Sequence, residues 1–186
     1  MNEPIIRPAG PDDARAIAQV RVDSWRTTYK GMIPDAYLAA MRVDDSAALW
    51  LRVLSAASSK ASVFVADNGG DLVGFAAGNL LAEPRHGLDA ELTAIYLRRD
   101  RQRAGIGRRL VAAQRALGAT GMLTWVIAGN RGARAFYEAL GAELLVEQPF
   151  QWDGMDLVEA GYGWRDLNAL LAALDGQLTE HSGEKA

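Results

Sequence analysis

The part of the sequence best suited to chemistry runs over residues 91–109 and reads ELTAIYLRRDRQRAGIGRR. Its apolar start predicts a strand, and Gly105 and Gly107 stand where that strand gives way to a helix. Glycines at such a junction let the backbone approach a ligand, and the first N–H groups of a helix attract anions together with the helix dipole. The sequence therefore predicts a site for a pyrophosphate group at residues 102–107.

The charge around this junction supports a ligand with several phosphates. Seven arginines lie between Arg98 and Arg115 against a single acid, Asp100, so the local charge is near +6 in a chain whose net charge is −3. The alternative is a glycine pair that eases a tight turn beside a solvated arginine face. No Gly-Lys-Ser/Thr follows as in a P-loop, and Leu110 stands where a dinucleotide motif has its third glycine.

A second candidate segment begins 28 residues after Gln102, at Asn130. Trp125 and its neighbours predict a buried strand, Asn130 follows it, and a helix then carries Ala133, Phe136, Tyr137 and Leu140 up to Gly141. Asn130 is suited to cap that helix, and Gly141 to end it.

Together the two segments resemble the acetyl-CoA-binding motifs of the GNAT family of N-acetyltransferases. The first matches Gln/Arg-x-x-Gly-x-Gly/Ala after a strand, and the second matches that family's strand–Asn–helix–Phe-Tyr–Gly pattern. The resemblance covers roughly residues 4–164. It implies an α/β (mixed α+β) acyl-CoA N-acyltransferase fold, with a central mixed, mostly antiparallel sheet of about seven strands and flanking helices.

The resemblance also implies acetyl-CoA as the co-substrate, without a metal, and it assigns residues to its binding. The strand before the signature would hold the pantetheine arm, the loop would hold the pyrophosphate, and Asn130 and its helix would position the arm. The residues implied are Ile95, Tyr96, Leu97, Gln102, Arg103, Ala104, Gly105, Ile106, Gly107, Arg108, Asn130, Ala133, Phe136 and Tyr137.

Amine acetylation requires a base and benefits from an acid. A free alkyl amine has a pKa of about 10, so a base must remove a proton before the amine attacks a thioester. The resemblance points to Glu91 as the base and Tyr137 as the acid for the leaving thiolate. Glu91 as a surface charge and Tyr137 as a core aromatic are the structural alternatives. The chain has no cysteine, which favours direct transfer over an acyl-enzyme.

The resemblance implies that the acceptor is an amine of a small molecule, a peptide or a protein. Trp25 and Tyr29, with Tyr37, occupy the region where the family places its variable acceptor loop, and Glu91 is a third substrate-binding candidate. Trp25 and Tyr29 also continue the apolar stripe of the first helix, so packing is an alternative role. Glu83 and Asp89 suggest a cationic amine, whereas His86 is expected to be a surface residue.

Residue patterns predict the elements that position these side chains. Strands are expected at 5–7, 62–66, 72–76, 90–97, 122–128, 142–147 and 155–164. An amphipathic helix begins after Asp12 or Asp13, a helical region in two pieces covers 34–58, and helices begin near 106 and 130. A last helix, 166–178, precedes a polar tail. We expect one acetyltransferase domain, 1–164, followed by the C-terminal helix and tail, 165–186.

Composition excludes several function classes. Without cysteine there is no disulfide framework, thiolate zinc site or iron–sulfur cluster. We expect no signal peptide, membrane helix or nucleic-acid partner, and a cytoplasmic location. Two alternatives to the enzyme stay open. One is a regulatory module that binds acyl-CoA without turnover, and the weaker one is an RNA-binding protein, although no aromatic residues interleave with its arginines. The resemblance also allows a homodimer.

Overall fold

The computed structural model describes residues 3–56 and 58–174, and these form two compact units. The first unit comprises residues up to Gly78 and Ala94–Gln114, and the second comprises Asn79–Thr93 and the residues from Arg115 onward. A seven-stranded sheet has the order β1-β2-β3-β4-β5-β7-β6, and β4 and β5 are parallel. The mixed, mostly antiparallel sheet predicted from the sequence is confirmed.

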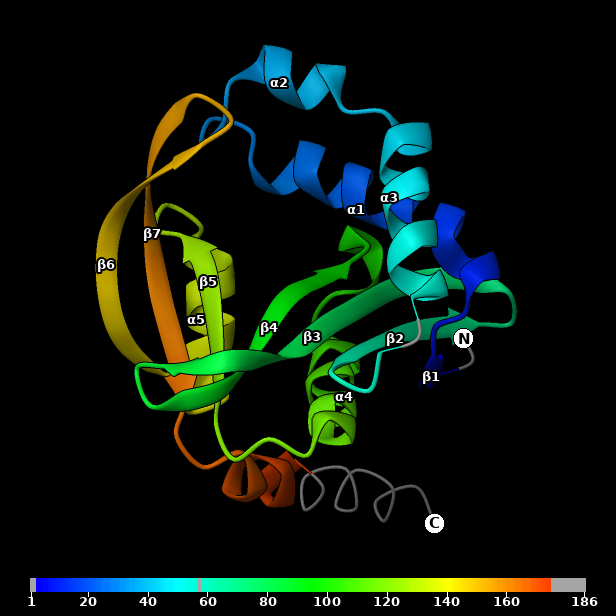
Figure 1. Cartoon of the computed structure of the whole chain (residues 1–186). Helices are drawn as coiled ribbons and strands as arrows, with labels where there is room; N and C mark the ends of the chain where they lie inside the picture. Colours follow the sequence, from blue (N-terminus) through cyan, green and yellow to red (C-terminus); the bar gives the residue numbers. More distant parts are fainter. Residues whose placement is uncertain (1–2, 57, 175–186) are drawn as a thin grey trace. The chain divides into compact units, whose positions relative to one another are not determined.

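The first unit holds the N-terminal helices and four strands (Figure 1). In chain order its elements are β1 (Ile5–Pro8), the 3₁₀ turn η1 (Pro11–Asp13), α1 (Ala14–Thr28), α2 (Asp35–Ala40), α3 (Val43–Ser55), β2 (Ala61–Asn68), the first part of β3 (Asp71–Arg85), the last part of β4 (Leu88–Leu97), the 3₁₀ turn η2 (Arg99–Arg101) and α4 (Ile106–Ala113).

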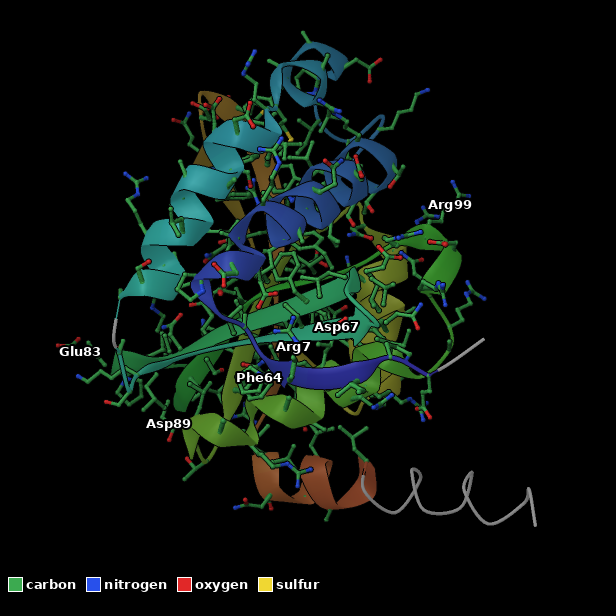
Figure 2. All side chains as sticks on the ribbon, turned by 90° about the vertical axis from the view of Figure 1, so that its right-hand side faces the viewer. Arg7, Phe64, Asp67, Glu83, Asp89 and Arg99 are labelled. Atoms are coloured by element: carbon green, nitrogen blue, oxygen red, sulfur yellow. The ribbon has the colours of Figure 1, made fainter. Side chains whose placement is uncertain are left out.

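The amphipathic pattern of α1 is confirmed, because all its predicted apolar positions are buried. They are Ala14, Ile17, Ala18, Val22, Trp25 and, just past the helix end, Tyr29. Asp13 stands at the N-cap position of α1, as predicted, but the turn η1 precedes the helix and the Asp13 carboxylate makes no cap bond to it. Asp13 instead accepts from the Gly10 N–H and pairs with Arg7, 2.8 Å away. Arg7 also reaches Asp67 of β2 at 2.9 Å (Figure 2), so this arginine ties β1, η1 and β2 together.

The second unit is built on the remaining parts of β3 and β4. Its further elements are the 3₁₀ turn η3, which starts in the first unit (Gln114–Leu117), β5 (Met122–Ile127), α5 (Arg131–Ala139), β6 (Glu143–Trp152), β7 (Met155–Trp164) and a helix over residues 167–174. Asp166 caps that helix through the N–H of Ala169, at 2.9 Å. The predicted helix end at 175–178 and the tail lie outside the described residues.

The hairpin of β3 and β4 is longer than the sequence predicted. The segment with Glu83, His86 and Asp89 was expected to be a loop, but β3 continues to Arg85 and β4 begins at Leu88. His86 and Gly87 form the connection with φ angles of 52° and 77°. Two left-handed residues close a tight hairpin, which allows the strands to extend to the turn. Within the described residues, no helix is long and apolar enough to cross a membrane.

Candidate functional site

The predicted anion loop lies in the first unit, between β4 and α4. Arg103 and Gly105 both have left-handed backbones, with φ angles of 61° and 77°. Gly105 is the N-cap of α4, so the N–H groups of Ile106 and the following residues have no acceptor within the helix. Residues of this conformation turn successive N–H groups toward one side, as in anion-binding nests. The loop therefore has a backbone suited to phosphate oxygens.

The arginines near the loop are less available than their number suggests. Arg98 pairs with Asp71 at 2.9 Å and with Asp100 at 3.1 Å, and Arg109 pairs with Glu3 at 2.6 Å. Arg99 and Arg103 are exposed and make no ion pair with any described residue. Acids distant in sequence thus neutralise part of the local charge, and two exposed guanidinium groups remain for an anion.

The end of β4 is held by its neighbours within the first unit. The Leu97 carbonyl oxygen accepts from the Ser24 hydroxyl at 3.4 Å and from the Gln102 amide at 3.3 Å. Gln102, predicted to contact the cofactor, therefore braces the loop against the strand in this structure. A Cβ at Gly74 would lie 2.9 Å from the Tyr96 carbonyl oxygen, so β3 approaches this end of β4 closely. Ile95, Tyr96 and Leu97 thus have a fixed backbone.

Trp25, Tyr29 and Tyr96 form a cluster that we call the α1 aromatic group. The rings of Trp25 and Tyr29 lie 4.8 Å apart, edge to face, and both residues are buried. The side chains of Tyr29 and Trp25 hydrogen-bond to Tyr96. Burial raises the pKa of Tyr96, although these bonds and the positive charge of Arg21 oppose the shift. The structure thus brings the two predicted acceptor residues together, and they pack as the α1 pattern also predicted.

Glu91 lies in the second unit, on the stretch of β4 that pairs with β5. Its register partner is Leu123, and its side chain is 18% exposed. Burial raises the pKa of Glu91 despite Arg85, whose guanidinium lies 3.5 Å away, and Glu159 adds to the shift. A carboxylate with a raised pKa is a stronger base than an ordinary one. Glu91 is therefore a partly buried carboxylate and not a freely solvated strand-end charge.

The other two acids of the hairpin have different environments. Asp89 accepts hydrogen bonds from the N–H groups of Thr120 and Gly121, at 3.0 and 2.8 Å, and from the Thr120 hydroxyl. Burial raises the pKa of Asp89, but these bonds outweigh burial and the net shift is downward. Asp89 is thus occupied in holding the start of β5, while Glu83 is exposed. Of the three acids, Glu91 is the one whose environment favours proton transfer.

Asn130 caps α5, as the sequence predicted. Its Oδ1 accepts from the N–H of Ala133 at 3.1 Å, and Asn130 is 9% exposed. The backbone N–H of Asn130 also donates to the Ile127 carbonyl at 2.8 Å, which fixes the turn between β5 and the helix. The cap sets where α5 begins, and it therefore sets the position of Tyr137 two turns later.

Tyr137 is more deeply placed than the sequence suggested. We expected its ring to pack beside a stripe of Ala133, Phe136 and Leu140, but Ala133 and Phe136 are half-buried whereas Tyr137 is 5% exposed. Its ring centroid lies 6.0 Å from that of Tyr162 and 5.8 Å from that of Trp164, both on β7. The aromatic residues of β7 thus fix the ring of Tyr137.

Sequence reasoning missed a polar network that anchors α5. Arg134 donates from Nε to the Tyr162 hydroxyl at 3.0 Å and from Nη1 to the Ala128 carbonyl at 3.2 Å, and it pairs with Glu147 at 2.8 Å. The Tyr162 hydroxyl donates in turn to Glu138 at 2.6 Å. These contacts join α5 to the ends of β5, β6 and β7. No local pattern predicts them, because their partners lie up to 28 residues apart.

The predicted site residues thus fall into two groups. The loop, the end of β4 and the α1 aromatic group belong to the first unit, whereas Glu91, Asn130, Ala133, Phe136 and Tyr137 belong to the second. In the part of the chain that the structure describes, no three His, Asp or Glu side chains are grouped so as to hold a metal ion.

Residues 22–142 match the model of the acetyltransferase (GNAT) family. The chain is 40% identical over 175 residues to the uncharacterized N-acetyltransferase YuaI of Bacillus subtilis, covering 91% of this chain and 98% of YuaI. It is 30% identical over 167 residues to the probable N-acetyltransferase Rv2775 of Mycobacterium tuberculosis, covering 84% and 91% of the two chains.

Solved structures share the fold at lower identity. The PaiA N-acetyltransferase of Thermoplasma acidophilum in complex with coenzyme A superposes with a TM-score of 0.68 at 23% identity, covering 86% of this chain and 98% of PaiA. The putative acetyltransferase yncA of Salmonella typhimurium with acetyl-CoA gives a TM-score of 0.62 at 18% identity, covering 89% and 95%. At these identities the two likenesses show a shared fold.

Proposed function

Because this chain belongs to the GNAT family of acetyltransferases, and is on that ground an acetyl-CoA-dependent N-acetyltransferase, we propose that it transfers the acetyl group directly to a primary amine of a small molecule, peptide or protein. The observation that carries this proposal is the left-handed loop at the start of α4, with Arg103 and Gly105 at φ angles of 61° and 77°. It supplies the anion-binding backbone that the family motif requires.

The residues of the first unit fit a coenzyme with phosphates. The N–H groups of residues 103–108 would bind the pyrophosphate, and the exposed side chains of Arg99 and Arg103 would add positive charge. The backbone of Ile95, Tyr96 and Leu97 would hold the pantetheine arm. When bound, acetyl-CoA supplies a thioester whose acetyl carbon an amine can attack.

Glu91 acts as the general base in this proposal. Its raised pKa and partial burial support the role, since the carboxylate can take the proton of an ammonium group and return the neutral amine. The Arg85 guanidinium, 3.5 Å away, limits the shift and keeps the carboxylate ionised over a wider pH range.

Tyr137 acts as the general acid. Its ring is held between α5 and β7, which gives the phenol a fixed position, as efficient proton transfer requires. In the transfer, the C–N bond forms, the C–S bond breaks, Glu91 accepts the amine proton and Tyr137 donates a proton to the thiolate. Asn130 positions Tyr137 by setting the start of α5.

The function is tested by acetyl-CoA-dependent thiol release against a panel of amines, with the products identified by mass spectrometry. We expect thiol release that depends on a particular amine and that Tyr137→Phe slows. Tight acetyl-CoA binding with no thiol release for any amine would instead indicate the non-catalytic binding module.

A further inference from the structure

A pocket of about 310 Å³ opens among the three N-terminal helices of the first unit. Arg21 of α1 and Tyr37 of α2 line it, together with Arg42 before α3 and Asp45, Ser46 and Leu49 within α3. Figure 1 shows these three helices. The volume suits a small molecule, because ligand pockets begin at about 300 Å³. The proposed function leaves this pocket unused.

The pocket contains two guanidinium groups, and nearby Asp44, which pairs with Arg15, acts on Arg42 through its charge alone. Neither Arg21 nor Arg42 forms an ion pair with any residue that the structure describes. The neighbouring arginine of α1 differs, because Arg26 donates to the carbonyls of Leu38 and Met41, at 3.2 and 2.7 Å, and so fixes α2 against α1. Asp45 is the one acid of the lining, which leaves a net charge of +1, the complement of a monoanion.

Ser46 is a buried polar residue of the pocket lining. The residue is 6% exposed, and its Oγ has no hydrogen-bond partner among the described residues. A buried hydroxyl normally has a partner. The Ser46 hydroxyl is therefore a candidate donor to a ligand oxygen in this pocket.

Arg21 connects the pocket to the proposed acceptor residues. Its Cζ atom lies 4.9 Å from the centre of the Trp25 ring, and Trp25 belongs to the α1 aromatic group. A guanidinium over an aromatic face occupies the position where a cationic ligand would otherwise bind. This part of the acceptor region is therefore unfavourable for a second ammonium group, as in a polyamine, and favourable for an anion.

We infer that the pocket of Arg21, Arg42 and Ser46 binds the carboxylate of the acceptor, so that the acceptor is an amino acid or a short peptide with a free carboxylate. The inference rests on the proposed function and names its substrate class. A guanidinium group binds a carboxylate through two parallel N–H···O bonds. A phosphate dianion matches the net charge of +1 less well than a carboxylate does.

Binding is tested without turnover, by saturation-transfer NMR on the whole chain. The probes are N-acetylglycine, which has a carboxylate but no reactive amine, N-acetylglycinamide, which lacks the charge, and inorganic phosphate as a competitor. We expect binding of N-acetylglycine alone, weakened about tenfold by Arg21→Gln or Arg42→Gln. Arg52→Gln is the matched control, because Arg52 is exposed on α3 outside the pocket lining, and it should bind like the wild type.

Turnover is tested with amino acids paired with their carboxamides. We expect kcat/KM to favour the carboxylate by about tenfold or more in the wild type and in Arg52→Gln, and Arg21→Gln to remove this preference by lowering kcat/KM for the carboxylate more than for the amide. Equal rates within each pair, or binding of N-acetylglycine that both arginine variants retain, would overturn the inference. So would stronger competition by phosphate than by the carboxylate.

The carboxylate pocket and the acetyltransferase function can each be refuted without the other. Thiol release with amides, but no binding of N-acetylglycine, would refute the carboxylate pocket and leave the acetyltransferase function intact. Carboxylate binding that depends on Arg21, but no thiol release with any amine, would support the pocket and refute the proposed turnover.

Discussion

At the scale of single residues, Glu91 and Tyr137, the proposed base and the proposed acid, have different surroundings. Glu91 is a partly buried carboxylate whose pKa is raised by burial and only partly lowered by Arg85. Tyr137 is a buried phenol held by the rings of Tyr162 and Trp164. The surroundings of Glu91 would strengthen a base, and those of Tyr137 would fix the direction in which a phenol donates its proton.

Glu91→Gln should lower kcat/KM by about 10²-fold near neutral pH, because general-base catalysis contributes about 10² to 10⁴. In the wild type, kcat/KM should rise as the pH passes upward through the raised pKa of Glu91, and the variant should lack this rise. The deficit should shrink at high pH, where the amine is already neutral.

The stability of the same variant provides the control. A carboxyl whose folded-state pKa is raised contributes unfavourably to folding when it is ionised, above its folded pKa, and this penalty disappears below its unfolded pKa. Glu91→Gln should therefore not lower Tm at neutral pH. A loss of activity that is independent of pH, or no loss, would give Glu91 a structural role.

Tyr137→Phe keeps the ring and removes the hydroxyl. If the phenol is the acid, kcat should fall more than about tenfold, while acetyl-CoA affinity and Tm change little. Steady-state kinetics, calorimetry and thermal unfolding give the three quantities. A large drop in Tm with unchanged turnover per folded molecule would mark Tyr137 as a core tyrosine, a role its burial also fits.

At the scale of elements, the junction of β4 and α4 is the part that most depends on backbone conformation. Gly105 has a φ of 77°, and a Cβ there would meet no atom within 4 Å. Gly105→Ala therefore acts through backbone strain, because open space is available but the left-handed conformation is costly. Acetyl-CoA affinity should fall about tenfold, or about 1.4 kcal/mol, as measured by calorimetry.

Gly118→Ala is the matched control for this substitution. Gly118 has a φ of 66° and equally open surroundings, but it lies in the turn before β5. The Gly118→Ala variant should lose about as much free energy of unfolding as Gly105→Ala, but it should retain the wild-type affinity for acetyl-CoA. If both variants lose affinity equally, the effect reflects general destabilisation and the anion loop is wrongly assigned.

The sequence predicted most elements because their signals are local. The apolar stripe of α1 and the Asn130 cap depend on residues a few positions apart, and each is as predicted. The length of the β3–β4 hairpin was underestimated, because the predicted strands end at 76 and begin at 90, whereas two left-handed residues close the hairpin at 86 and 87.

The supporting contacts could not be predicted, because they join distant segments. Gln114 is fully buried and binds Ser62, 52 residues away. The Arg134 network and the role of Asp89 at the start of β5 likewise required three-dimensional structure. The seven arginines were visible in the sequence, but the distant acids that pair with two of them, Asp71 and Glu3, were not.

At the scale of the whole molecule, an acidic chain is expected to bind an anionic coenzyme through a local concentration of positive charge. The net charge of −3 opposes such binding at long range, so the exposed side chains of Arg99 and Arg103 must act over short distances. Salt screens exposed charges with a Debye length of about 10 Å at 0.1 M.

CoA affinity should therefore fall with rising salt more than the affinity for a phosphate-free pantetheine fragment. The double substitution Arg99→Gln and Arg103→Gln should reduce this difference, whereas Arg52→Gln should preserve it. Calorimetric titrations at several ionic strengths measure the affinities of the wild type and of both variants for CoA and for the fragment. Equal salt dependence for CoA and the fragment would indicate that the arginines are only a solvated face.

The central claim is direct acetyl transfer to an amine, and initial rates over a matrix of acetyl-CoA and amine concentrations test it most directly, with released thiol and acetylated amine quantified in the same reactions. We predict equal amounts of the two products, no acetyl-CoA consumption without amine, and double-reciprocal lines that intersect, as a ternary complex requires. Thiol release at the same rate with and without amine, or parallel lines from a covalent intermediate, would contradict the account.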